Sequence, residues 1–229
     1  MNETIGWWKE LFSEDQSRWR QTLLEAATGS AAWTAAVREW PGAERLDREA
    51  RRVDPAAPLA GVPFGVKDLF DEAGAVTRAG SILLEKIGEP AERDATVLRR
   101  LRALGAVPVG RTNMNEFAYG LDGFNPHTGN CPHPRDERRI SGGSSSGSAW
   151  IVGSGVLPVA LGTDTGGSVR VPAALCGIYG YRGSPGADAG EGVFPLSSTF
   201  DTVGWFTRTA KDMLALIELL GPGAEGRAG

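Results

Sequence analysis

The chain has 229 residues, of which 41% are hydrophobic and 23% are charged, a composition typical of a folded, soluble protein with one large domain or two small ones. Its formal net charge is −4 and its arginines are spread over several predicted helices, so the sequence has no basic stripe for nucleic acid. No stretch resembles a membrane span or a signal peptide, and we expect a cytoplasmic protein with a small-molecule partner and no membrane or nucleic-acid contact.

Residues 1–55 are predicted to form a helical segment. Helices are expected over Glu14–Thr28, Ala31–Trp40 and Glu44–Arg52, with glycine or proline after the first two. The tryptophans of this segment are expected to pack it onto the rest of the chain, and the alternative is an exposed aromatic face that docks a partner. These tryptophans are Trp7, Trp8, Trp19, Trp33 and Trp40.

Strands and helices alternate from Leu59 onward, and residues 56–221 are predicted to form one α/β core before a flexible tail, 222–229. The predicted helices are Ala95–Leu104 capped by Asp94, Ser146–Val152, Val169–Leu175, and Ala210–Leu220 opened by Thr209 and Asp212. The predicted strands are the apolar run Leu59–Val66, Ala106–Gly110, Val156–Leu161 and Gly177–Tyr181. This order predicts an α/β fold, with a mostly parallel mixed sheet covered by helices on both faces.

One glycine-rich segment places a serine after a predicted strand and at the start of a helix. It reads Gly-Thr-Asp-Thr-Gly-Gly-Ser and ends at Ser168. The backbone amides of Thr165, Gly166, Gly167 and Ser168 can converge there on one point, which suits the stabilisation of an oxyanion.

A nucleophilic serine needs a base, and the sequence favours lysine over histidine for that role. The chain has only two histidines, His127 and His133, both in a proline-rich loop, so a Ser-His-Asp triad is not expected. Lys67 ends an apolar run and is one of only four lysines. Burial lowers the pKa of a lysine, which would make Lys67 a competent base.

Together with the segment Ser141-Gly-Gly-Ser-Ser-Ser-Gly147, these motifs resemble the amidase signature family from about Leu59 to Leu220. Its Ser–cis-Ser–Lys triad matches in order and type, with Lys67 as base, Ser144 as the bridging serine after a cis peptide bond, and Ser168 as nucleophile. Two secondary motifs agree, Gly110–Phe117 and Phe194–Ser197 with Asp201–Gly204. One difference is Tyr181-Arg-Gly-Ser184, where relatives usually have Phe or Leu followed by Lys-Pro-Thr.

The resemblance implies hydrolysis of a carboxylic amide through an acyl-enzyme on Ser168, without a cofactor. Ser145, Asp164 and Arg170 are expected to support the triad, by bracing it rather than by touching substrate. Family chains run to about twice this length, and their later half completes the sheet and much of the pocket. The pocket is therefore expected to need a partner subunit or a homodimer. Two other hypotheses stay open: a non-catalytic or half-enzyme scaffold, and the glutamine-hydrolysing subunit of a tRNA-dependent amidotransferase.

Simpler interpretations exist for the same residues. Lys67 alone could be a surface lysine, and Ser144 and Ser168 could cap helices. His127, Cys131 and His133 lack the spacing of a zinc site, so no metal is expected. Agreement of three motifs in one register favours the catalytic interpretation over these.

Overall fold

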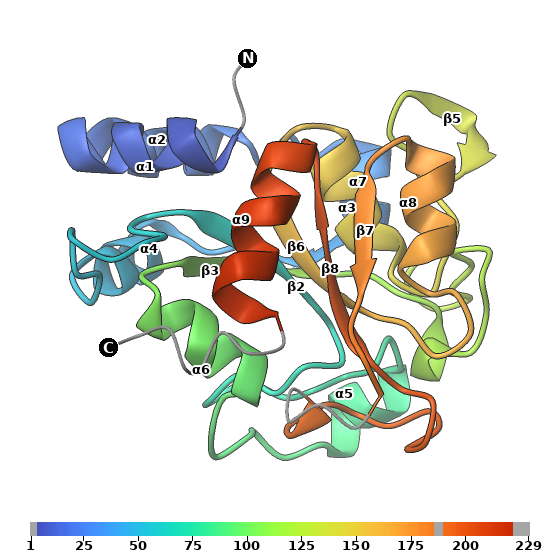
Figure 1. The fold of residues 1–229 in the computed structure, drawn as a ribbon. Coiled ribbons are helices and arrows are strands. Elements are labelled where there is room, and N and C mark those ends of the chain that lie inside the picture. The colour runs from blue at the N-terminus through green and yellow to red at the C-terminus, as the bar shows by residue number, and fades with distance from the viewer. Residues whose placement is uncertain (1–3, 186–189, 222–229) are drawn as a thin grey trace.

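The computed structural model describes residues 4–185 and 190–221, and the predicted tail lies outside them (Figure 1). The helices are α1 (Ile5–Glu14), α2 (Gln16–Glu25), α3 (Ala31–Ala36), α4 (Ala43–Ala50), α5 (Ile82–Ile87), α6 (Thr96–Ala103), α7 (Ser146–Gly153), α8 (Arg170–Cys176) and α9 (Ala210–Leu220), with a 3-10 turn η1 (Glu116–Ala118). The strands are β1 (Val37–Glu39), β2 (Pro63–Lys67), β3 (Val107–Thr112), β4 (Pro132–His133), β5 (Asp136–Ile140), β6 (Val159–Thr163), β7 (Tyr179–Arg182) and β8 (Val203–Thr207).

A six-stranded sheet in the order β1-β3-β2-β6-β8-β7 forms the centre of the molecule. Strands β3, β2 and β6 pair in parallel, while β1 and β8 are antiparallel to their neighbours. The expected mixed sheet is therefore confirmed, with a parallel centre of β3, β2 and β6 and antiparallel strands on either side. Since parallel strands end at the same edge, Lys67 at the end of β2 and Thr163 at the end of β6 emerge on one side of the sheet.

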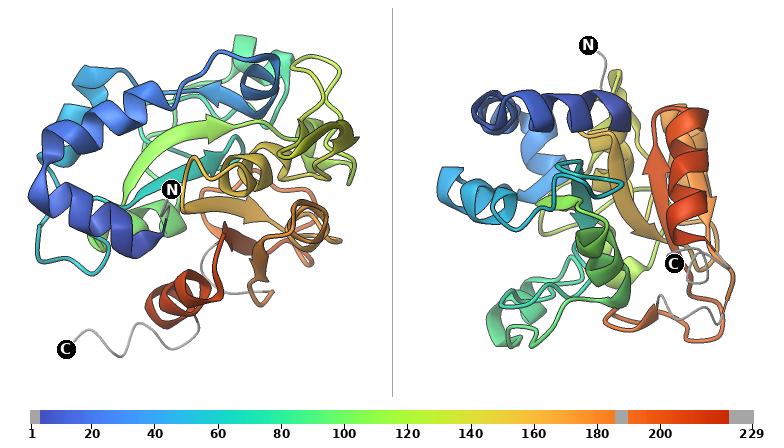
Figure 2. Two further views of the ribbon diagram at one scale, coloured as in Figure 1. Left: turned by 90° about the horizontal axis from the view of Figure 1, so that it is seen from above. Right: turned by 60° about the vertical axis from the view of Figure 1, so that its left-hand side comes forward.

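Helices cover both faces of this sheet (Figures 1 and 2). One apolar core includes Val107 and Val109 of β3 and lies under the N-terminal helices, α7 and α8. The second includes Phe64 and Val66 of β2 and lies under α6 and α9, which stand in front of the sheet in Figure 1. Successive strand residues point to opposite faces, so buried apolar runs can supply both cores.

The N-terminal tryptophans pack against the body rather than forming an exposed face. Trp8, Trp19 and Trp33 are buried in the same core as β3. The predicted helix Ala31–Trp40 is wrong at its end, because α3 stops at Ala36 and Val37 begins a strand that pairs with β3. A β-branched residue at the edge of the sheet gains ladder hydrogen bonds there that a longer helix would forgo.

Two further predictions about local structure have clear outcomes. The last helix is confirmed, and the Thr209 hydroxyl accepts a hydrogen bond from the Asp212 amide at 3.1 Å. The proposed cap of α6 is wrong, because its N-cap is Ala95, without a side-chain hydrogen bond. Asp94 instead accepts from the Ala73 amide at 2.8 Å and pairs with Arg102. Four further elements, α1, α5, the β4–β5 hairpin and β8, have no counterpart among the elements predicted from the sequence.

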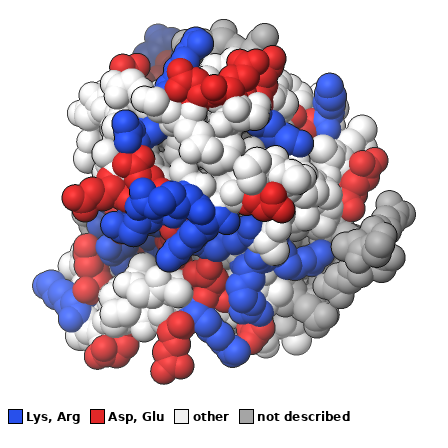
Figure 3. Space-filling view, turned by 90° about the vertical axis from the view of Figure 1, so that its left-hand side faces the viewer, with Lys and Arg blue, Asp and Glu red and all other residues white. Residues whose placement is uncertain are grey.

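Charges of both signs cover the face that carries α4, where lysines and arginines gather beside carboxylates (Figure 3). A cavity of about 720 Å³ opens between α4 and α6. Two of the arginines that line it are paired with carboxylates, Arg45 with Glu39 and Glu72, and Arg102 with Glu49. The cavity contains none of the predicted site residues. Among the described helices, none has the length and hydrophobicity to cross a bilayer.

Candidate active site

Lys67 lies at the end of β2 with its side chain fully buried. Its Nζ is 2.8 Å from Ser144 Oγ and 2.8 Å from Thr163 Oγ1. Burial lowers the pKa of Lys67 from 10.5 to about 7, although the charges of Asp164 and Asp201 act in the opposite direction. Lys67 is therefore not a surface lysine. Near neutral pH about half of the protein molecules carry a neutral Lys67 amine.

Ser144 lies in the tight segment before α7, and the Gly143–Ser144 peptide bond is cis, as the resemblance implies. The Gly143 amide donates to the Leu121 carbonyl at 2.8 Å, and the Asn115 amide donates to the Ser144 carbonyl at 3.3 Å. A Cβ on Gly143 would lie 2.0 Å from Asn115 Oδ1, so only glycine fits. These contacts hold the Ser144 hydroxyl against Lys67.

Ser168 lies in the turn between β6 and α8, and 4% of it is exposed. Its carbonyl accepts a hydrogen bond from the Ser145 amide at 3.3 Å, which ties this turn to the residue after Ser144. Neither predicted serine caps a helix, because the N-caps of α7 and α8 are Ser145 and Val169. Lys67 and Ser144 are therefore in contact at one edge of the sheet, and the turn that carries Ser168 is bonded through its backbone to the residue after Ser144.

Asp164 organises the turn that carries Ser168. Its carboxylate accepts hydrogen bonds from the amides of Gly167 at 2.8 Å, Val169 at 3.1 Å and Arg170 at 3.2 Å. The Arg170 side chain adds two more, at 3.0 and 2.9 Å. Burial alone would raise the pKa of Asp164, but these bonds, those of Arg170 first, bring it below its ordinary value. Asp164 and Arg170 thus brace the turn.

The predicted oxyanion site needs one correction. The Gly167 amide is already bonded to Asp164, so it is not a free donor. Among the described residues, the amides of Thr165, Gly166 and Ser168 have no protein acceptor. Three of the four predicted amides are therefore available to an oxyanion.

Ser145 braces the same region from α7. Its hydroxyl lies 3.3 Å from both the carbonyl oxygen and the amide nitrogen of Thr163. It is fully buried, so it fastens the start of α7 to the end of β6 and has no surface to offer a substrate.

Comparison with known proteins decides the family. The family model described as Amidase matches residues 23–221. The chain belongs to the amidase family. It is 45% identical over 165 residues to Amidase 1 of Oryza sativa subsp. japonica, which covers 72% of this chain and 38% of that protein. It is 44% identical over 177 residues to one component of the glutamyl-tRNA(Gln) amidotransferase of Thermus thermophilus, covering 76% of this chain and 37% of that one.

A solved amidase-family structure shows the same fold. The crystal structure of the K. lactis urea amidolyase superimposes with a TM-score of 0.86 at 32% identity, over 95% of this chain and 13% of that one. The chain spans less than half of the length of the curated relatives it matches.

Two residues of this amidase-family site were missed by the sequence analysis. Thr163 contacts Lys67 directly, and its place at the end of the strand beside β2 is the signal that could have found it. Asp201 accepts a hydrogen bond from the Thr165 hydroxyl, and its charge acts on Lys67. The motif Asp201–Gly204 was identified in the sequence, but no role for Asp201 was predicted, because its contact with Thr165 depends on the unpredicted strand β8.

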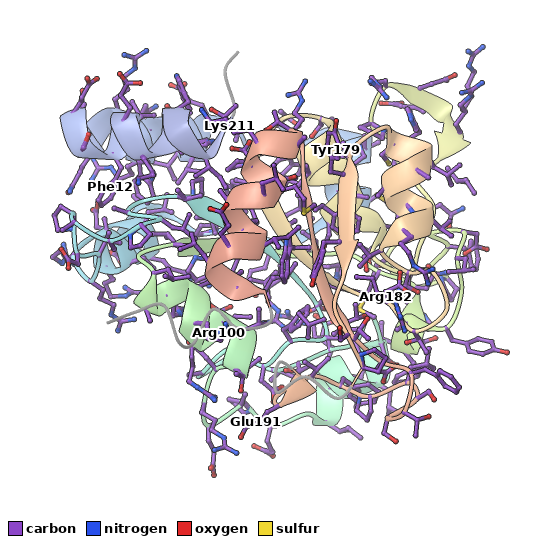
Figure 4. The ribbon with its side chains drawn as sticks, in the orientation of Figure 1. Phe12, Arg100, Tyr179, Arg182, Glu191 and Lys211 are labelled. Atoms are coloured by element: carbon purple, nitrogen blue, oxygen red, sulfur yellow. The ribbon has the colours of Figure 1, made fainter. Side chains whose placement is uncertain are left out.

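Arg182 was noted in the sequence only as a difference from relatives. It is the last residue of β7, and Tyr179 is the first, at the other end of the strand (Figure 4). Its Nε is 3.2 Å from Asp164 Oδ1, and its Nη2 donates to the Phe200 carbonyl at 3.1 Å. Arg182 thus joins the nucleophile turn to the segment before β8.

The proline-rich loop has structural partners of its own. His133 Nε2 lies 3.1 Å from the Leu175 carbonyl, His127 pairs with Glu116, and Cys131 is buried. No group of three or more metal-ligating side chains occurs among the described residues.

Proposed function

We propose that this chain carries the nucleophile and the base of an enzyme that hydrolyses a carboxylic amide, with Ser168 acylated during the reaction. The observation that carries the proposal is the fully buried Lys67, 2.8 Å from Ser144 Oγ, with a pKa of about 7. A structural lysine gains nothing from such burial, whereas a base needs a pKa near the working pH. Membership of the amidase family supports amide hydrolysis as the reaction class.

In the proposed mechanism, neutral Lys67 accepts the Ser144 hydroxyl proton while Ser144 accepts that of Ser168. Ser168 Oγ then attacks the amide carbonyl carbon, and the carbonyl oxygen becomes an oxyanion. The free amides of the Thr165–Ser168 turn are the proposed donors to it. The amide nitrogen takes the proton back through Ser144 and leaves as ammonia or amine. Water, deprotonated by the same relay, releases the carboxylate and restores Ser168.

The proposed substrate is a small-molecule amide. Because the chain covers only 38% and 37% of two of the matched relatives, we propose that residues outside it contribute to the pocket. They would come from further residues of the same protein, from a partner subunit or from a second copy. From the sequence alone we also expect a cytoplasmic location and a reaction without a cofactor.

An alkyl fluorophosphonate, which forms a covalent bond with activated serines, tests the proposal without knowledge of the substrate. Intact mass and peptide mapping should show one adduct, on Ser168, in the wild type. Ser168→Ala and Lys67→Ala should abolish it. Ser154→Ala is the matched control, because Ser154 lies at the far end of α7 and its hydroxyl only donates to the Ile151 carbonyl. An adduct on another serine, or none on folded wild type, would refute the proposal.

A second candidate function is favoured by the similarity to the Thermus thermophilus amidotransferase component. In that case the amide would be glutamine, and the ammonia would pass to a partner enzyme. Co-purification of a tagged chain from its native host separates the two functions: stable partner proteins and glutamine-dependent ammonia release favour the amidotransferase, whereas activity without partners favours a free-standing amidase.

A further inference from the structure

Asp201 lies in the segment before β8, outside the predicted triad and its supporting residues. One of its carboxylate oxygens, Oδ1, accepts a hydrogen bond from the Thr165 hydroxyl. The other, Oδ2, accepts from the amides of Leu196 at 2.8 Å and Ser197 at 2.9 Å. Three donors therefore converge on a group that, when ionised, can only accept. This single side chain joins the nucleophile turn to the Phe194–Ser197 motif.

The backbone beside Asp201 strengthens the same junction. The Asp164 amide donates to the Thr202 carbonyl at 2.9 Å, and the Thr202 hydroxyl donates to the Asp164 carbonyl at 2.8 Å. These bonds continue the antiparallel ladder in which Thr163 of β6 faces Val203 of β8. Asp164 is thus bonded to Thr202, and the next residue, Thr165, is bonded to Asp201. The turn that begins at Thr165 consequently depends on the segment before β8 for its position.

Asp201 also differs from the other carboxylates near Lys67 in how its charge is compensated. Asp164 is paired with two arginines, at 2.9 and 3.2 Å, and Asp68 is paired with Arg111 at 2.7 Å. Within residues 4–185 and 190–221, no cationic side chain lies within ion-pair distance of Asp201. The charges of Asp164 and Asp201 both raise the pKa of Lys67 against the effect of burial. Of the two carboxylates, Asp164 raises the pKa of Lys67 more, and Asp201 adds to it.

We propose that Asp201 is a positioning residue for the amidase reaction, which fixes the turn that carries Ser168 and places a negative charge near Lys67. The proposal rests on the proposed function of Ser168 and Lys67. It also assigns a role to the Asp201–Gly204 motif, whose first residue connects the base, the nucleophile turn and the Phe194–Ser197 motif.

Two variants separate charge from position. In Asp201→Asn the side-chain oxygen can still accept from Leu196 and Ser197, and the new amide can donate to the Thr165 hydroxyl, so the junction is kept and the charge is lost. In Thr165→Val the charge is kept and the bond to Asp201 is lost. Asp136→Asn is the control for net charge, because Asp136 lies on the exposed β4–β5 hairpin and pairs with Arg138.

The first readout is the titration of Lys67 itself. The chain has only four lysines, so carbon NMR of protein labelled at lysine Cε gives few signals, and Lys67→Met assigns the one of interest. In wild type this signal should titrate near pH 7. In Asp201→Asn it should titrate at clearly lower pH, while in Thr165→Val and Asp136→Asn it should stay in place. Equal titration in Asp201→Asn and Asp136→Asn would overturn the charge part of the proposal.

The second readout is the rate of fluorophosphonate labelling of Ser168. Thr165→Val should slow it about tenfold at every pH, because a misplaced turn weakens catalysis whatever the state of the base. In Asp201→Asn the acid limb of the rate profile should move to lower pH. An unchanged rate in Thr165→Val would overturn the positioning part. If wild type is not labelled while Lys67 still responds to Asp201→Asn, the proposed function fails and the electrostatic link stands.

Discussion

Replacing Lys67 with methionine should abolish labelling and yet stabilise the protein at neutral pH. The pKa of Lys67 falls from 10.5 to about 7 on folding, chiefly through burial. At 1.36 kcal/mol per pKa unit, this corresponds to about 5 kcal/mol of stability lost when both states are protonated, as an upper bound. Methionine avoids this cost, but Ser144 and Thr163 lose a hydrogen-bond partner, at about 1–2 kcal/mol each. The variant should gain roughly 1–3 kcal/mol near pH 7.

The sign of the pH dependence follows from proton counts. Between pH 7 and 10.5 the unfolded chain holds more protons at Lys67 than the folded chain, so wild-type stability rises with pH in this window. The advantage of Lys67→Met should therefore shrink and reverse towards pH 10. Urea unfolding at several pH values, followed by tryptophan fluorescence, measures this difference. Lys86→Met, on the exposed surface of α5, is the control for the lost charge. A difference between wild type and Lys67→Met that stays constant with pH would refute the reasoning.

Two further predictions concern packing and thiol reactivity. Gly147→Ala should destabilise the fold by several kcal/mol or prevent folding, because its Cβ would lie 2.1 Å from the Ala36 carbonyl oxygen. Gly6→Ala, whose Cβ meets nothing closer than 3.9 Å, should be neutral or slightly stabilising in the same thermal unfolding assay, and similar losses in both variants would contradict the packing. Burial raises the pKa of both cysteine thiols, Cys131 and Cys176, to about 12. Neither should react with iodoacetamide at pH 8 until urea is added, and rapid alkylation of the native protein would count against their burial.

Strand–helix alternation and the reactive motifs were predictable because they depend on short stretches of sequence. The run before Lys67 indicated burial, and the glycines before Ser144 and Ser168 indicated tight turns. The resemblance to relatives then supplied the cis bond before Ser144. Each of these features depends on a stretch of about ten residues, so it could be predicted without knowing which distant segments are in contact in the fold.

The features that escaped prediction depend on long-range pairing. Strand β8 inserts antiparallel between β6 and β7, and only this order brings Asp201 beside Thr165. Likewise, Val37 joins the sheet because Thr112, 75 positions later, offers an edge. Asp94 has the sequence position of a helix N-cap, but in the structure its carboxylate accepts a hydrogen bond from the Ala73 amide instead. The local sequence does not determine which distant residue a polar side chain will bond to.

The central claim is that neutral Lys67, acting through Ser144, activates Ser168. The most direct measurement is the pH dependence of fluorophosphonate labelling at Ser168 between pH 5.5 and 9, read by mass spectrometry on wild type and Lys67→Met. The rate should be half-maximal near pH 7, fall about tenfold per unit on the acid side, and vanish in the variant. A rate that is independent of pH across this range, or labelling that persists in Lys67→Met, would contradict the account.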